Sequence, residues 1–203
     1  ADTMRLYEMF IGDFEKTAPW KTSSIKGCKR FLERVCGLFD VMTDEEGYSK
    51  ELESSFHKTI KKVSEDIENL KFNTAIAALM SLLNEISDKG SITRGEMTTF
   101  ITLLNPFAPH LTEELNERMG NTTLLTYMTW PQYDPAKCVD EQVEIVVQIC
   151  GKIKARLMVS PDASQEEVKA AAMENEAVRQ ALEGKSVVKE IYVKGKLLNI
   201  VAK

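Results

Sequence analysis

Residues 103–115 read LLNPFAPHLTEEL, and the two prolines in this stretch divide it between two helices. Apolar residues recur at helical spacing up to Pro106, which cannot continue a helix because it lacks a backbone N–H and fixes φ. Pro109 suits the first position of a new helix, where the N–H has no intrahelical partner. The stretch therefore predicts two helices joined by a bend, with Phe107 and Leu111 directed into one core.

Helical periodicity extends over most of residues 1–137 and predicts an antiparallel bundle with short connections. We expect helices near residues 4–11, 24–42, 50–70, 72–90, 94–105 and 109–120. Asp2 or Thr3 would cap the first helix, and Ser49 would cap the third. The predicted core includes the following residues of the second and third helices: Phe31, Leu32, Val35, Leu38, Phe39, Met42, Leu52, Phe56, Ile60, Val63, Ile67 and Leu70.

Two details of this helical region are specific enough to be tested. Thr93 and Glu96 have the spacing of a capping box, and Ile92 and Met97 are placed to form its hydrophobic staple. His57 lies beside the apolar stripe of its helix, so we expect a histidine on the helix surface rather than a metal ligand.

Residues 138–203 follow a period of two and predict a small α+β domain of β-β-α-β-β order. A three-residue loop at residues 149–151, with Gly151 in the left-handed region, keeps both faces of the first hairpin chemically uniform. A turn at Gly195-Lys196 would pair Val193 with Leu198. Between the hairpins, residues 164–167 form a second capping box before a helical region that Asn175 can divide in two.

Composition excludes several classes of protein. With 43% hydrophobic and 28% charged residues, the 203-residue chain has the makeup of a globular protein with a packed core. No apolar run approaches the ~20 residues of a membrane span, so we expect no membrane partner and a cytoplasmic location. The four cysteines form no Cys-x-x-Cys pair, which predicts buried free thiols and no metal site. The net charge of −5 is no argument for RNA binding, which depends on local patches.

Several motifs resemble one family of enzymes in their wording and order. The motif PFAPHxxEEL, which begins at Pro106, is similar to a signature of the anticodon-binding helical domain in class I aminoacyl-tRNA synthetases of the leucine, isoleucine and valine group. Members often carry Trp directly after this motif, where this chain has Asn116. Residues 5–12, 71–77, 149–156 and 195–201 resemble successive parts of leucyl-tRNA synthetases of the bacterial type.

The resemblance implies that the chain is the C-terminal portion of a longer enzyme, a leucine–tRNA ligase. It divides the chain into a connector (residues 1–20), an anticodon-binding-type bundle (21–137) and a small C-terminal tRNA-binding domain (138–203). The catalytic and editing domains would lie upstream, and ATP and Mg²⁺ would serve the full enzyme, with no cofactor in this portion. We expect a monomer that binds tRNA(Leu).

The candidate RNA-binding residues are cations at regular spacing. Lys26, Arg30 and Arg34 lie four apart on one predicted helix, where they can follow phosphates. A second set would project from one face of a strand and from the last hairpin turn: Lys152, Lys154, Arg156, Lys194 and Lys196. We assign no catalytic residue, because the sequence has no glycine-rich phosphate loop and no Ser-His-Asp or Cys-His arrangement.

Two other interpretations remain open at this point. The chain can be a helical scaffold that binds proteins and has no RNA role. It can also be the corresponding part of a valyl- or isoleucyl-tRNA synthetase, although the β-β-α-β-β tail disfavours this, because those enzymes typically end differently.

Overall fold

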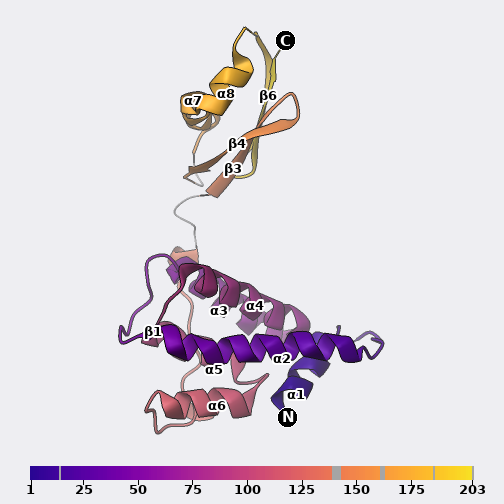
Figure 1. Cartoon of the computed structure of the whole chain (residues 1–203), viewed down its shortest axis with the longest axis vertical. Helices are drawn as coiled ribbons and strands as arrows, with labels where there is room; N and C mark the ends of the chain where they lie inside the picture. Colours follow the sequence, from indigo (N-terminus) through magenta and orange to yellow (C-terminus); the bar gives the residue numbers. More distant parts are fainter. Residues whose placement is uncertain (14, 139–142, 161–162, 185, 203) are drawn as a thin grey trace. The chain divides into compact units, whose positions relative to one another are not determined.

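The computed structural model describes residues 1–13, 15–138, 143–160, 163–184 and 186–202. Contacts divide the chain into two compact units, unit 1 (Ala1–Cys138) and unit 2 (Val139–Lys203), each of which is described by itself. Unit 1 is helical and unit 2 combines a sheet with two helices (Figure 1). Within the described part of the chain, no helix is both long enough and apolar enough to cross a membrane.

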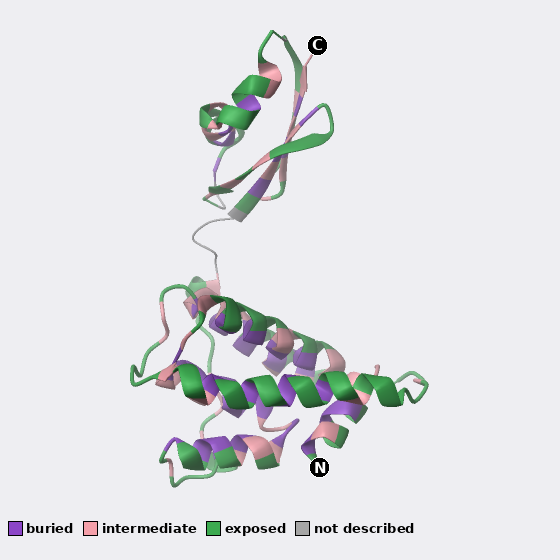
Figure 2. Ribbon diagram, in the orientation of Figure 1, coloured by how far each residue is buried: buried purple, intermediate pink, exposed green. Residues whose placement is uncertain are grey.

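In the described residues of unit 1, six α-helices pack around one core. The helices are α1 (Asp2–Phe10), α2 (Thr22–Gly37), α3 (Glu53–Glu68), α4 (Phe72–Lys89), α5 (Arg94–Leu104) and α6 (Pro109–Arg118). A 3₁₀ turn at Leu38–Val41 continues α2, and the short strands β1 (Met42–Thr43) and β2 (Ile92–Thr93) pair in parallel. Buried residues line one side of α3 and α4 and exposed residues line the other, as amphipathic helices require (Figure 2).

The predicted break at the two prolines is confirmed. Helix α5 ends at Leu104, α6 begins at Pro109, and Phe107 between them is completely buried. The ring of Phe107 meets that of Phe72 edge to face, with centroids 6.0 Å apart. Leu111 packs against the same core. The bend therefore places a buried aromatic side chain in the core of unit 1.

The capping box at the start of α5 is also confirmed, and its glutamate also binds a residue from another part of the chain. The Thr93 hydroxyl accepts from the Glu96 N–H (3.0 Å), and the Glu96 carboxylate accepts from the Thr93 N–H (2.9 Å). The same buried carboxylate accepts from the N–H of Ser49 (2.7 Å) and from its hydroxyl. Ser49 therefore braces α5, and the prediction that it caps α3 is wrong, because α3 begins at Glu53 after Leu52.

The predicted cap of α1 is wrong for a similar reason. The N-cap residue is Ala1, and Asp2 already lies within the helix. The carboxylate of Asp2 is used elsewhere: it accepts from the Leu111 N–H (2.7 Å) and contacts His110 Nδ1 (2.7 Å). A tertiary contact has taken the place of a local one.

Leu70 was predicted in the core, but it lies on the surface with 61% of its area exposed. Helix α3 ends at Glu68, and Leu70 takes a left-handed conformation with φ 57° in the turn to α4. The reversal of the chain points its side chain outward. The other predicted core residues of α2 and α3 are buried or pack against the core.

His57 is buried, and the prediction of a surface histidine is wrong. Residues 130–138, which we call the strap, run along α3 and cover it. His57 Nδ1 accepts from the Asp134 N–H at 2.9 Å. Trp130 Nε1 donates to Ser64 Oγ at 2.8 Å, and Lys137 pairs with Glu53 at 2.7 Å. The sequence could not show this, because the segment that covers the histidine lies 77 residues further along the chain.

Unfolding should reveal the neutral state of this histidine. Burial, together with the nearby charge of Lys137, lowers the pKa of His57 from its ordinary 6.5. Below pH 6.5 the unfolded chain therefore binds a proton that the folded chain does not, so the stabilisation is complete above that pH and declines as the pH falls toward the lowered pKa. We expect urea midpoints to fall between about pH 7 and pH 5. The variant His57→Asn retains an acceptor for the Asp134 N–H and should flatten this decline; an equally steep decline in the variant would assign the effect to other groups.

Unit 2 contains a four-stranded sheet with two helices on one side (Figure 1). Its elements are β3 (Val143–Ile149), β4 (Lys152–Val159), α7 (Gln165–Glu174), α8 (Glu176–Leu182), β5 (Val187–Val193) and β6 (Leu197–Ala202). The strand order is β4-β3-β6-β5, and the central strands β3 and β6 are parallel. The capping box of Ser164 with Glu167 is confirmed, and Asn175 separates α7 from α8 by capping α8.

Both hairpin loops of unit 2 differ in length from the prediction. Ile149 pairs with Lys152, which leaves a two-residue loop in which Cys150 and Gly151 both have positive φ (49° and 79°). In the second hairpin Val193 pairs with Leu197, which leaves three residues in the loop. The predicted partner of Val193, Leu198, is therefore wrong by one residue. The first error has a clear cause: Lys154 is an extra residue in a β-bulge, and the bulge changes which side chains of β4 face the core.

Candidate nucleic-acid interface

The three predicted cations of α2 are exposed, and one of them is firmly held. Arg34 donates from Nη1 to Asn84 Oδ1 and from Nη2 to Ser87 Oγ, both at 2.9 Å. Arg30 lies one turn earlier and Lys26 one turn before that. These residues therefore form a stripe along α2 that is anchored to α4 at one end.

The cations of β4 do not share one face, contrary to prediction. Lys152 pairs with Ile149, whose side chain faces the helices, whereas Arg156 pairs with Val146 on the opposite face. Lys154 lies at the bulge between them. Arg156 also forms an ion pair of 2.9 Å with Glu144, so its charge is partly neutralised. The prediction that these three cations project from one face of the strand is therefore wrong.

Lys194 and Lys196 lie in the loop between β5 and β6 and are both exposed. The carbonyl of Lys196 accepts from the Val146 N–H at 3.1 Å, which fixes the loop against β3. This loop therefore presents two lysine side chains from a well-anchored backbone.

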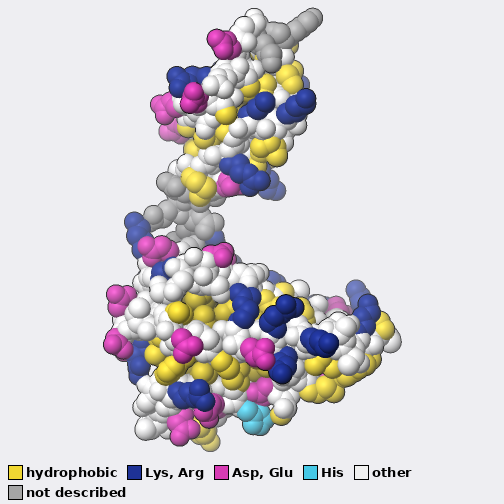
Figure 3. Space-filling view, viewed as in Figure 1, with side chains coloured by type: hydrophobic (Ala, Val, Ile, Leu, Met, Phe, Trp, Pro, Cys, Tyr) yellow, Lys and Arg dark blue, Asp and Glu magenta, His cyan; other side chains and the backbone are white. Residues whose placement is uncertain are grey.

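The face of the sheet away from α7 and α8 carries exposed apolar side chains. Ile153 is 57% and Met158 59% exposed on edge strand β4, and Ile191 and Val193 are about 40% exposed on edge strand β5. Their cross-strand partners Gln148, Glu144, Asn199 and Leu197 place all four on the same side, which we call the open face. Figure 3 shows hydrophobic and basic side chains interspersed on the visible side of unit 2.

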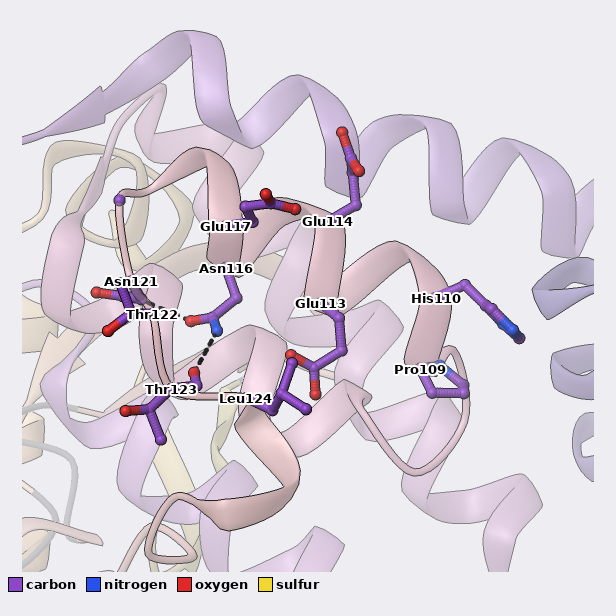
Figure 4. Close-up of a pocket in the computed structure, with 11 residues that line it drawn as sticks. Pro109, His110, Glu113, Glu114, Asn116, Glu117, Asn121, Thr122, Thr123 and Leu124 are labelled. Atoms are coloured by element: carbon purple, nitrogen blue, oxygen red, sulfur yellow. Dashed lines mark hydrogen bonds between the residues drawn. The ribbon is translucent and has the colours of Figure 1, made fainter.

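A cavity of about 830 Å³ lies beside α6 and is acidic (Figure 4). Glu113 and Glu114 point in different directions, as expected for neighbours on a helix. Glu113 accepts from the Leu125 N–H (3.1 Å), and Glu114 pairs with Arg118 (2.8 Å). Asn116 donates to the Thr123 carbonyl at 2.8 Å. Glu113 and Asn116 therefore hold the following loop in place. The carboxylates that line this cavity would repel phosphates, so it does not suit RNA.

The proline bend anchors α1. Arg5 donates from Nε and Nη2 to the Pro106 carbonyl at 3.1 and 2.9 Å, and Asp2 binds His110 and Leu111. Burial alone would raise the pKa of the Asp2 carboxyl, but the hydrogen bonds from His110 and Leu111 outweigh this and lower the pKa below its ordinary value. The bend between α5 and α6 is therefore also bound to α1.

The described residues contain no group of three or more His, Cys, Asp or Glu side chains able to hold a metal ion. Cys28 is buried as predicted, and burial raises the pKa of its thiol. Cys36 and Cys150 are exposed, so the prediction of buried thiols is wrong for them.

Residues 49–170 match the family described as the anticodon-binding domain of tRNA ligase. This match covers more than half of the chain. The chain belongs to this anticodon-binding family. The resemblance that begins at Pro106 is confirmed, and the matched region includes α3 to α6 and continues into unit 2.

Two relatives of this family member are informative. The chain is 52% identical over all 203 residues to a leucine–tRNA ligase from Alkaliphilus oremlandii (strain OhILAs), of which it spans 25%. It also resembles the synthetase in the crystal structure of the ternary complex of Agrobacterium radiobacter K84 agnB2 LeuRS with tRNA and LeuAMS, with a TM-score of 0.73 and 26% identity. That match covers the whole of this chain and 29% of the other.

Proposed function

We propose that this chain is the tRNA-binding C-terminal portion of a leucine–tRNA ligase. The observation that carries the proposal is the 52% identity that extends over both units to a leucine–tRNA ligase. The full enzyme attaches leucine to tRNA(Leu) with ATP and Mg²⁺, works as a cytoplasmic monomer and holds its catalytic and editing groups outside these residues. The identity favours this reading over a valyl- or isoleucyl-tRNA synthetase, and the family match favours it over a protein-binding scaffold.

In this proposal the two units have different tasks. Unit 1, after its connector, is an antiparallel bundle that binds the body of the tRNA and does not read the anticodon. The α2 stripe of Lys26, Arg30 and Arg34 binds phosphates there. Unit 2 is the small domain of β-β-α-β-β order, with its helical region in two parts, and it contacts the corner of the tRNA. The α/β content of the chain and its likeness to the LeuRS structure support this division.

The open face is the surface of unit 2 that best suits RNA. The four exposed apolar side chains of this face can pack against bases or ribose, and such contacts do not depend on the identity of the base. Arg156 lies on the same face, and Lys194 and Lys196 lie at the end of β5. Lys152 and Lys154 become secondary candidates, because they do not lie with Arg156.

Charging the open face should weaken tRNA binding. We expect Ile153→Glu combined with Ile191→Glu to lower the affinity of residues 1–203 for tRNA(Leu) about tenfold, because the new carboxylates repel phosphates and remove apolar contacts. The Tm should change little, since both side chains are exposed. Fluorescence anisotropy with labelled tRNA measures the affinity.

A matched control is Leu124→Glu, which places one carboxylate on an exposed apolar residue of unit 1 beside the acidic cavity. Its affinity should stay within about twofold of the wild-type value. Equal affinity of the double variant and the wild-type chain would exclude the open face from the RNA interface.

A further inference from the structure

A cavity of about 430 Å³ lies between the end of α1, one side of α2 from Ser24 to Arg34, and the middle of α4. Phe10, Phe31 and Met80 give it an apolar wall, and Arg30 and Arg34 line it with positive charge. Its size is that of sites for small organic ligands. An apolar wall beside cations is suited to a ligand that has both a flat apolar part and an anionic part.

The charge of Arg34 is fixed in position but not neutralised. Both of its recorded acceptors are neutral: the Asn84 amide oxygen and the Ser87 hydroxyl, which itself donates to the Leu83 carbonyl at 2.7 Å. Two of the five guanidinium N–H groups are thus used, and three can bind a ligand. Among the described residues, neither Arg30 nor Arg34 forms an ion pair, whereas Lys29 pairs with Glu33 and Arg118 with Glu114.

Gly27 supplies a second, independent observation. It lies inside α2, where glycine is less favourable than alanine by about 1 kcal/mol. A Cβ at this position would meet no atom within 4 Å, so helix packing does not require glycine there. Gly27 lines the same cavity one turn before Arg30. Because glycine has no side chain, a ligand in the cavity can approach the backbone of α2 closely, and glycine often serves this purpose at ligand sites.

We propose that this cavity holds one nucleotide of the bound tRNA. Arg30 and Arg34 bind its phosphate, and the ribose or base lies over Gly27 and against the apolar wall. The inference rests on the proposed function. A guanidinium group can bind two phosphate oxygens at once, which suits Arg30 and Arg34. Four residues of helix advance about 6 Å, so Lys26 can bind the phosphate of an adjacent nucleotide.

Filling the space above Gly27 tests the proposal, because stability and binding should respond in different ways. We expect Gly27→Leu to leave the Tm of residues 1–203 unchanged or higher, since leucine favours helix and meets open space. Its affinity for labelled tRNA(Leu) should fall about tenfold, because the side chain occupies the place of the nucleotide. The matched control is Gly37→Leu, at the end of the same helix, where an added Cβ also meets no atom within 4 Å and which does not line this cavity.

If Gly27→Leu lowers the Tm, two further variants test the same site. Arg30→Gln should reduce the slope of log affinity against log salt by about one, as expected for one lost phosphate contact. Arg34→Lys retains the charge but not the fork and should weaken binding about fivefold. If the wild-type chain binds tRNA(Leu) and these variants bind as it does, the nucleotide site is wrong and the proposed function stands. If the wild-type chain does not bind, both fall.

Discussion

The substitution Gly95→Ala should destabilise unit 1 by about 3 kcal/mol, the upper part of the range for an added group in a packed site. A Cβ at Gly95 would lie 1.9 Å from the Glu46 carbonyl oxygen and 2.6 Å from its carbon. Those are backbone atoms, and they cannot move freely: the Gly95 N–H donates to the Glu45 carbonyl (3.2 Å), and the Thr93 hydroxyl donates to the Gly47 carbonyl (2.5 Å). Relieving the clash would break the contacts that join this loop to the capping box.

Urea unfolding followed by circular dichroism measures this loss. The control is Gly37→Ala, where the added Cβ meets nothing within 4 Å and alanine favours the helix, so the variant should be as stable as the wild-type chain or more so. A Gly95→Ala variant with wild-type stability would mean that the loop at residues 45–47 does not rest on α5.

The second large effect is expected from Phe107→Ala, with a loss of about 3 to 5 kcal/mol. Phe107 is completely buried between α5 and α6, and its ring packs edge to face on Phe72. Removal leaves a cavity that the proline bend cannot close, because Arg5 and Asp2 hold the bend to α1. Thermal unfolding should show the loss as a lower Tm of unit 1.

Tyr127→Ala is the matched aromatic control. Its side chain is 79% exposed, and its loss should change the free energy of unfolding by less than about 0.5 kcal/mol. Similar values for the two variants would contradict the central place of Phe107 in the core.

Helices of unit 1 could be predicted because their signals are local. Apolar spacing, the prolines at 106 and 109, and the capping box at Thr93 each act within a few residues, as does the capping box at Ser164 in unit 2. The failures at Asp2, Ser49 and His57 have a common cause: each side chain is bound by a segment far along the chain. Local sequence therefore predicted which elements form and the boundaries at the prolines and capping boxes, but not which polar group contacts a distant element.

Unit 2 was harder to predict because strand faces depend on register. Placing Lys152 on the polar side required a three-residue loop, but the chain uses two residues in the turn and puts the extra one in the strand at Lys154. That bulge exposes Ile153 and separates Lys152 from Arg156. The predicted cation row was lost for this reason, and an apolar open face took its place as the better candidate. In the α2 stripe, the contacts of Arg34 with Asn84 and Ser87 could not be predicted, because they join positions 50 and 53 residues apart.

Hydroxyl-radical footprinting of tRNA(Leu) bound to residues 1–203 tests the central claim most directly. The account predicts protection of the backbone in the body of the tRNA by unit 1 and at its corner by unit 2, with the anticodon loop as reactive as in free tRNA. Protection confined to the anticodon loop, or no protection at protein concentrations that saturate a specific complex, would contradict it.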